Sequence, residues 1–261
     1  MRIQMYVAVV LLGFLAANSA LAEQYTSGPK LAPLYPSPPY LATQTEHLSI
    51  VFEADEAVVR ELLPAGVQPA KGNTALLNMY TVRDSVGLGS YSVAYISYDV
   101  EGFDSPTGMK GRWMVQGWYG PDQATAAFRE MFGYPVVLGT TRVERQGERV
   151  RAVLTRHGAE LIEAQIRLTG KSFGQITGVT DYPSLRQVAR SQSGEIASSE
   201  IVSRLIPWAG ELLEAEPVSI TLKVPDKDPL KKLAPKKLLG AWMFKGTAIS
   251  IGHATAVKSI K

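Results

Sequence analysis

The sequence predicts a mostly β protein with a few helices, of the α+β class, built as a closed or nearly closed antiparallel barrel with helices at its side. Most of the chain alternates apolar and polar residues over short runs, which is typical of half-buried strands. Helical periodicity with start and stop signals is clear in only two segments. No internal repeat, low-complexity segment or linker divides the chain, so we expect one domain.

The first residues have the features of a processing signal. Arg2 precedes a short apolar run, Tyr6–Ala17, and Ala20-Leu21-Ala22 forms a small-x-small cleavage site. The apolar run is too short for a stable membrane span. Residues 1–22 are therefore predicted to be a cleaved signal peptide, which places the mature protein in the periplasm or outside the cell.

An extended arm is expected at residues 23–45, which are rich in proline and tyrosine. The single domain then occupies residues 46–261. Its first predicted strand is Glu46–Phe52. Alternation places its residues on two faces, with Leu48, Ile50 and Phe52 on one and Thr45, His47 and Ser49 on the other.

The next elements are a short helix and two strands. Asp55 is a suitable N-cap for a helix over Glu56–Leu63, which Pro64 ends. Strands are predicted over Thr74–Val82 and Ser90–Val100, with a glycine-containing turn between them.

In the middle of the chain, an aromatic strand at Arg112–Tyr119 leads into a second helix. That helix is predicted over Gln123–Phe132, because Pro121 precedes it and Gly133 follows it. Residues 140–155 read as a hairpin around Gln146-Gly147-Glu148, and alternation resumes over Ala159–Leu168.

The last third reads mainly as strand. Strands are predicted over Glu195–Arg204 and Val218–Val224, with a short helix around Trp208–Glu216 between them. A proline turn at Asp228-Pro229-Leu230 precedes a final strand that contains Trp242-Met243-Phe244.

Composition excludes several classes of function. The chain has no cysteine, which excludes disulfides and thiolate chemistry. His47, His157 and His253 lack the spacing of a zinc site, and no metal or other cofactor is expected. The formal charge of +3, about +2 once Arg2 is removed, does not indicate a nucleic-acid partner. The sequence also lacks esterase, nucleotide-binding and metalloprotease motifs.

The stretch Phe128–Gly139, FREMFGYPVVLG, resembles the G-R-E-x-x-x-[YF]-P-K-K-L-G segment of the acetoacetate decarboxylase family. The residues that fall on this pattern are Arg129, Glu130, Tyr134, Pro135, Leu138 and Gly139. The Gly87-Leu88-Gly89 turn with Tyr91 looks like a second segment of the family. The resemblance implies a β cone with an internal cavity for a small molecule, and assembly into a homo-oligomer.

The same resemblance implies that the family's reactive groups have been replaced. The family forms a Schiff base on the first of two adjacent lysines, and these positions are Val136 and Val137 here. Its carboxylate-binding arginine becomes Thr45, and its two pocket glutamates become Asn78 and Val93. We therefore expect no decarboxylation through an imine.

His47 and Asn78 are the catalytic candidates that remain. An imidazole with an unshifted pKa would serve as a general base, and an amide could hold a carbonyl or hydroxyl oxygen. Alternatively, both are ordinary hydrogen-bonded residues of the barrel. Likewise, an aromatic and apolar group would be either the pocket wall or plain core: Tyr91, Tyr95, Trp113, Trp118 and Met243.

Three functions are consistent with the sequence. The first is an exported lyase- or isomerase-type enzyme for a small, mostly apolar oxo or hydroxy compound. The second is a non-catalytic binding protein for a lipophilic small molecule. The third is a 3-oxo acid decarboxylase in which Lys110 or Lys245 has replaced the lost lysine.

Overall fold

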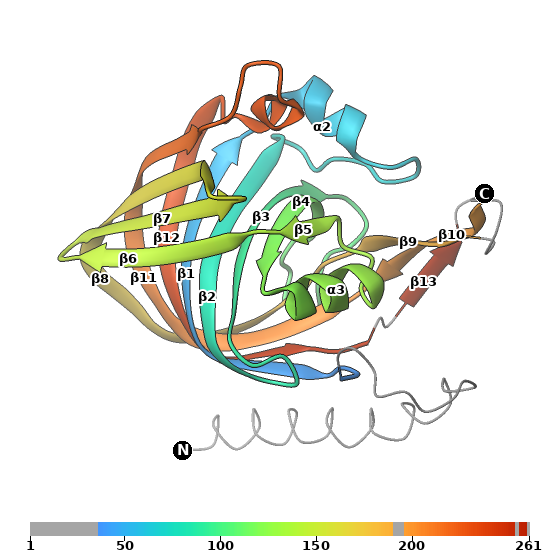
Figure 1. Ribbon diagram of the computed structural model, residues 1–261, viewed down its shortest axis with the longest axis horizontal. Helices are drawn as coiled ribbons and strands as arrows, with labels where there is room; N and C mark the ends of the chain where they lie inside the picture. Colours follow the sequence, from blue (N-terminus) through green and yellow to red (C-terminus); the bar gives the residue numbers. More distant parts are fainter. Residues whose placement is uncertain (1–35, 190–195, 254–255, 260–261) are drawn as a thin grey trace.

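The computed structural model describes residues 36–189, 196–253 and 256–259, which fold into two β-sheets with helices at the side (Figure 1). The larger sheet has ten strands in the order β5-β4-β3-β2-β1-β12-β11-β8-β7-β6. Every strand pair in it is antiparallel except β4 with β5. In chain order its strands are β1 (Tyr40–Glu53), β2 (Thr74–Val86), β3 (Tyr91–Val100), β4 (Gly111–Gly120), β5 (Val136–Leu138), β6 (Thr140–Gln146), β7 (Arg149–Arg156), β8 (Ala159–Asp181), β11 (Leu205–Leu222) and β12 (Lys237–Ile251).

The smaller sheet has three strands in the order β13-β10-β9. They are β9 (Ser184–Ala189), β10 (Ile196–Ser203) and β13 (Ala256–Ser259). Figure 1 shows this sheet at the side of the large sheet, on the side where helix α3 (Asp122–Glu130) also lies.

The large sheet curls back on itself because its two edge strands are consecutive in the chain. Gly139 alone separates β5 from β6. Its amide donates to the carbonyl of Tyr119 at 3.0 Å, and a Cβ on Gly120 would lie 2.6 Å from its carbonyl oxygen. Only glycine at position 120 permits this close approach. The predicted class, mostly β with a curled antiparallel sheet, is confirmed.

The two faces of β1 match the predicted alternation. Leu48, Ile50 and Phe52 are at most 1% exposed and belong to the core between the two halves of the curled sheet. His47 and Ser49 point to the opposite face, where they line a cavity. One strand therefore supplies both a core and a site, as its period of two requires.

The first two predicted helices are present. Helix α2 (Glu56–Leu62) is capped by Asp55, whose carboxylate accepts from the amide of Ala57 at 2.8 Å. Helix α3 buries Phe128 and ends before Gly133, which has a φ of 69°. A 3-10 helix, η2 (Pro229–Leu233), forms at the predicted proline turn. No helix in the described part of the chain is long and apolar enough to cross a membrane.

The helix predicted around Trp208–Glu216 is wrong, because these residues lie within β11. Trp208 and Leu212 face the cavity, whereas Leu213 and Ala215 pack on the core, which is a period of two rather than 3.6. Pairing with β8 on one side and β12 on the other overrides the helical propensity of the Glu, Leu and Ala residues.

The predicted boundary between arm and domain also needs correction. Strand β1 begins at Tyr40, so residues 40–45 belong to the sheet rather than to an arm. Tyr40 is fully buried, with its ring 5.8 Å from that of Phe132. Burial of this ring explains why the strand starts early. The predicted signal peptide and the arm up to residue 35 lie outside the described residues.

Candidate active site

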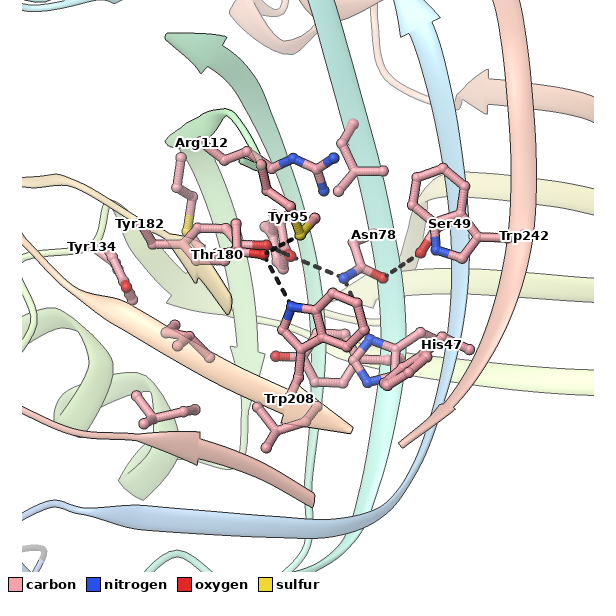
Figure 2. Close-up of a pocket in the computed structure, with 18 of the residues that line it drawn as sticks. His47, Ser49, Asn78, Tyr95, Arg112, Tyr134, Thr180, Tyr182, Trp208 and Trp242 are labelled. Atoms are coloured by element: carbon pink, nitrogen blue, oxygen red, sulfur yellow. Dashed lines mark hydrogen bonds between the residues drawn. The ribbon is translucent and has the colours of Figure 1, made fainter. Parts of the chain in front are cut away.

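A cavity of about 310 Å³ lies on the face of β1–β4 that is turned away from the core (Figure 2). Strands β1 to β3 supply about half of its polar groups, including His47, Asn78 and Tyr95. Strands β11 and β12 supply much of its apolar wall, including Trp242 and Phe244. Its volume and its mixture of apolar surface with a few polar groups are typical of a site for a small ligand.

Cross-strand register builds the polar side of the cavity. Ser49, Asn78 and Tyr95 lie directly opposite one another on β1, β2 and β3. Ser49 donates to the Asn78 carbonyl oxygen at 3.1 Å, and the Asn78 amide nitrogen donates to the Tyr95 hydroxyl at 2.9 Å. Tyr95 is joined in turn to the hydroxyl of Tyr182 at 2.7 Å. Figure 2 shows Asn78 at the centre of this row.

His47 completes the network and is neutral at physiological pH. Its Nδ1 lies 3.4 Å from the Asn78 amide nitrogen, which can only donate, so Nε2 carries the proton and donates to the Thr45 hydroxyl at 2.8 Å. Its ring stacks on that of Tyr80 at 4.1 Å. Burial lowers the pKa of His47 to about 3. The expected unshifted pKa is therefore wrong, and the imidazole is too weak a base for proton abstraction near pH 7.

Several polar residues of the cavity were not found from the sequence, among them Arg112 and Tyr182. Arg112, on β4, lines it and pairs with Asp99 directly opposite on β3, with 3.3 Å between Nε and a carboxylate oxygen. Tyr182 follows the end of β8 and comes close only through the fold. The sequence feature that could have pointed to Arg112 was its position at the start of an otherwise aromatic and apolar strand.

Four of the five positions of the replaced family residues do not line the cavity. Thr45 is 1% exposed and bonded to His47. Val93 and Val136 are buried in the apolar cluster on the cavity side of the sheet, and a Cβ on Gly117 would lie 2.7 Å from Val136. Val137 packs against the core on the other face. Of these five replaced positions, Asn78 is the one that lines the cavity.

Most of the predicted pocket wall lies elsewhere. Trp113, Trp118 and Met243 belong to the core on the opposite face of the sheet. Tyr91 packs on Phe128, with ring centroids 5.9 Å apart, and does not line the cavity. The flanking residues Trp242 and Phe244 take the place predicted for Met243, whereas Tyr95 does line the cavity.

A bulge in β4 explains the error for the tryptophans. Ile96 pairs with Gln116, but its neighbour Ser97 pairs with Met114, so Val115 is an extra residue. This residue inverts the alternation along the strand. Trp113 and Trp118 consequently share the core face, although they are an odd number of positions apart.

Neither candidate lysine reaches the cavity. Lys110 is exposed and pairs with Asp104 at 2.9 Å, and this hydrogen bond raises its pKa, opposite to what imine formation needs. Lys245 is partly exposed, 3.7 Å from Glu211, while the preceding Phe244 points inward. Neither lysine is therefore placed to form an imine with a ligand in this cavity. No lysine is among the described residues that line the cavity.

Metal ligation has no basis in the residues that the structure describes. In those ranges, no three His, Asp or Glu side chains come together in a way that could hold a metal ion.

Comparison with known proteins supports the sequence resemblance. A model of the family described as "Acetoacetate decarboxylase (ADC)" matches residues 24–259. Acetoacetate decarboxylase from Clostridium botulinum (strain Eklund 17B / Type B) is 28% identical over 122 residues, which cover 47% of this chain and 48% of that protein. The enzyme from Clostridium beijerinckii (strain ATCC 51743 / NCIMB 8052) is 29% identical over 124 residues, 47% of each chain. The match spans about half the length of these curated relatives.

Solved structures share the fold over nearly the whole chain. Acetoacetate decarboxylase from Legionella pneumophila superposes with a TM-score of 0.77 at 16% identity, covering 91% of this chain and 94% of the other. The enduracididine biosynthesis enzyme MppR, in complex with the condensation product of pyruvate and imidazole 4-carboxaldehyde, gives a TM-score of 0.68 at 14% identity, covering 90% and 98%. An acetoacetate decarboxylase-like enzyme from Sphingomonas wittichii RW1 gives 0.64 at 18% identity, covering 90% and 99%.

Proposed function

Because this chain belongs to the acetoacetate decarboxylase family, we propose that it is a lyase- or isomerase-type enzyme that acts on a small, mostly apolar oxo or hydroxy compound without forming an imine. The observation that carries the proposal is the composition of the cavity. Its described lining includes a network of neutral hydrogen-bonding groups centred on Asn78, and no lysine. The family's lysine pair is also absent from the motif, where Val136 and Val137 stand.

Such a site acts by electrostatic stabilisation rather than by a strong base. Asn78 is held by three neighbours, so its amide dipole is fixed before a ligand arrives. Fixed neutral hydrogen-bonding groups stabilise the charge that develops on a carbonyl or hydroxyl oxygen, and the network that Asn78 holds in place ends at the Tyr95 and Tyr182 hydroxyls. His47, with its lowered pKa, orients Asn78 and keeps the cavity uncharged at this point.

The second candidate function is a non-catalytic binding protein for a lipophilic small molecule. The observation that favours it is the saturation of Asn78: its oxygen accepts from Ser49, and its two N–H groups donate to Tyr95 and His47. A binding protein needs shape and apolar area rather than a poised reactive group. Consumption of any compound by the purified protein would remove this candidate.

The test of imine chemistry is borohydride reduction in the presence of acetoacetate, pyruvate and a longer 3-oxo acid, each offered separately, followed by intact-mass analysis. We expect no covalent adduct, because the cavity offers no described amine to a carbonyl compound. A known imine-forming member of the family serves as positive control. An adduct that maps to one lysine would contradict the proposal and assign imine chemistry to this chain.

We also propose that the protein is exported, on the basis of the charged, apolar and small-residue segments of residues 1–22. Mass analysis of the protein recovered from the periplasm or the medium would then show Glu23 as its first residue. A cell-associated protein that retains residues 1–22 would contradict export.

A further inference from the structure

Several of the polar side chains that line the cavity have their hydrogen-bonding capacity used within the protein. Ser49, His47 and Asn78 satisfy one another in the network described above. On the opposite wall, the Trp208 indole donates to the Thr180 hydroxyl at 3.1 Å, and Thr180 in turn donates to the sulfur of Met109. A ligand gains little from these groups without breaking bonds that already exist.

The pair Tyr95 and Tyr182 holds one hydroxyl proton more than it uses. The Tyr95 oxygen already accepts from Asn78, and a single hydrogen bond of 2.7 Å joins the two hydroxyls. That bond uses one of the two phenolic protons, whichever residue donates. No oxygen or nitrogen of the described residues is recorded as accepting the other proton, so one O–H group remains free beside the cavity.

This free proton stays on the pair at physiological pH and lies near a positive charge. Burial raises the pKa of Tyr95 well above its ordinary value, so the phenol remains a donor. Arg112 interacts electrostatically with Tyr182, and it is the one charged side chain among the described residues that line the cavity. Its own charge is balanced by Asp99 at 3.3 Å. Figure 2 shows Arg112, Tyr95 and Tyr182 on one side of the cavity and Trp242 on another.

We propose that the Tyr95–Tyr182 pair, with Arg112 beside it, is the subsite that binds a carbonyl oxygen of the ligand, whose apolar part then packs against Trp208, Trp242 and Phe244. The one free O–H group and the balanced charge of Arg112 fit a neutral carbonyl, and they also stabilise the oxygen if it gains negative charge. The subsite selects for a ligand with an oxygen acceptor at one end and an apolar body. The inference rests on the proposed function only in placing the ligand in this cavity.

The test compares two probes of nearly equal shape, acetophenone and ethylbenzene, which differ in having a carbonyl or a methylene group. Affinities are measured by ligand-observed NMR titration, so that no turnover is needed. Wild-type protein is expected to bind acetophenone more tightly. The double variant Tyr95→Phe/Tyr182→Phe keeps both rings and removes both hydroxyls, whereas either single substitution would leave one hydroxyl proton free. We expect the double variant to weaken acetophenone binding by roughly tenfold, as for the loss of one hydrogen bond, and to leave ethylbenzene binding unchanged.

Tyr91→Phe is the matched control, because it makes the same change on the same strand at a residue that does not line the cavity. It should alter neither affinity. Equal affinity of wild-type protein for both probes, or an equal loss for both in the folded double variant, would overturn the subsite while the cavity remains a ligand site. If neither probe binds, the result would count against the proposed function as well. Failure of the subsite alone is thereby distinguished from failure of the proposed function.

Discussion

Asn78→Leu is expected to lower the melting temperature by roughly 5 to 10 °C and to weaken acetophenone binding. Leucine has the same branching as asparagine, so the packing of β2 is preserved while all of the hydrogen bonds of the amide are lost. Ser49, Tyr95 and His47 would each lose a partner in a buried site. Each polar group left unpaired there costs about 1–3 kcal/mol, less where it can turn to water in the cavity. For a domain of this size, 1 kcal/mol corresponds to about 2–4 °C.

Thermal unfolding followed by circular dichroism measures this effect, with Ser49→Ala as the graded control. Ser49 makes only one of the bonds to Asn78, so its removal should cost a smaller part of the same loss. If Asn78→Leu melts at or above the wild-type temperature, then the network does not form in solution. The roles that we assign to Asn78 and Tyr95 would then fail together.

The two faces of β1 could be predicted from the sequence because this strand is regular where it lines the cavity. No bulge interrupts it between Thr45 and Val51, so the faces to which Leu48 and His47 point follow directly from their positions in the sequence. The short helix after Asp55 and the helix before Gly133 were readable because their caps are local.

Features that depend on tertiary pairing could not be read in this way. The extra residue Val115 shifts the residues after it in β4 to the opposite faces of the sheet, and nothing in the aromatic sequence around it indicates the bulge. Tyr182 reaches Tyr95 across 87 positions of the chain. The neutral state of His47 follows from burial by Tyr80 and Phe244, which lie on the two strands adjacent to β1.

The resemblance to the family was more accurate for the fold than for the positions of side chains. It identified a curled sheet with a cavity, and Tyr134 of the motif does line that cavity. It also pointed to Asn78. The cavity nevertheless depends on Arg112 and Tyr182, which the motif does not contain. Family membership therefore locates the site, and the side chains actually present determine its chemistry.

The stability of the protein is expected to fall as the pH drops from about 6.5 to about 3, because of His47. An unfolded histidine takes up a proton below about pH 6.5, whereas folded His47 does so only near pH 3. Between these values the unfolded state binds more protons, so each unit of decrease in pH costs up to about 1.4 kcal/mol. The stabilisation is therefore complete above pH 6.5 and is lost progressively on acidification.

Urea denaturation at several pH values measures this slope, and the difference between wild-type protein and His47→Gln isolates the contribution of one residue. Glutamine does not titrate, and its amide can still accept from Asn78 and donate to Thr45. The titratable group in contact with His47 is Tyr80, whose pKa burial raises well above 10, so it does not contribute in this range. His157→Asn is the control, since His157 is exposed and has a φ of 52°, which asparagine tolerates.

The wild-type slope should exceed that of His47→Gln throughout this range, and His157→Asn should follow the wild type. Identical slopes for wild type and His47→Gln would mean that the imidazole is accessible and protonates freely. In that case His47 would regain the role of a general base that its burial excludes. Because Asn78 donates to its Nδ1 only while that nitrogen is unprotonated, the same result would also remove the orientation of Asn78 on which the proposed chemistry depends.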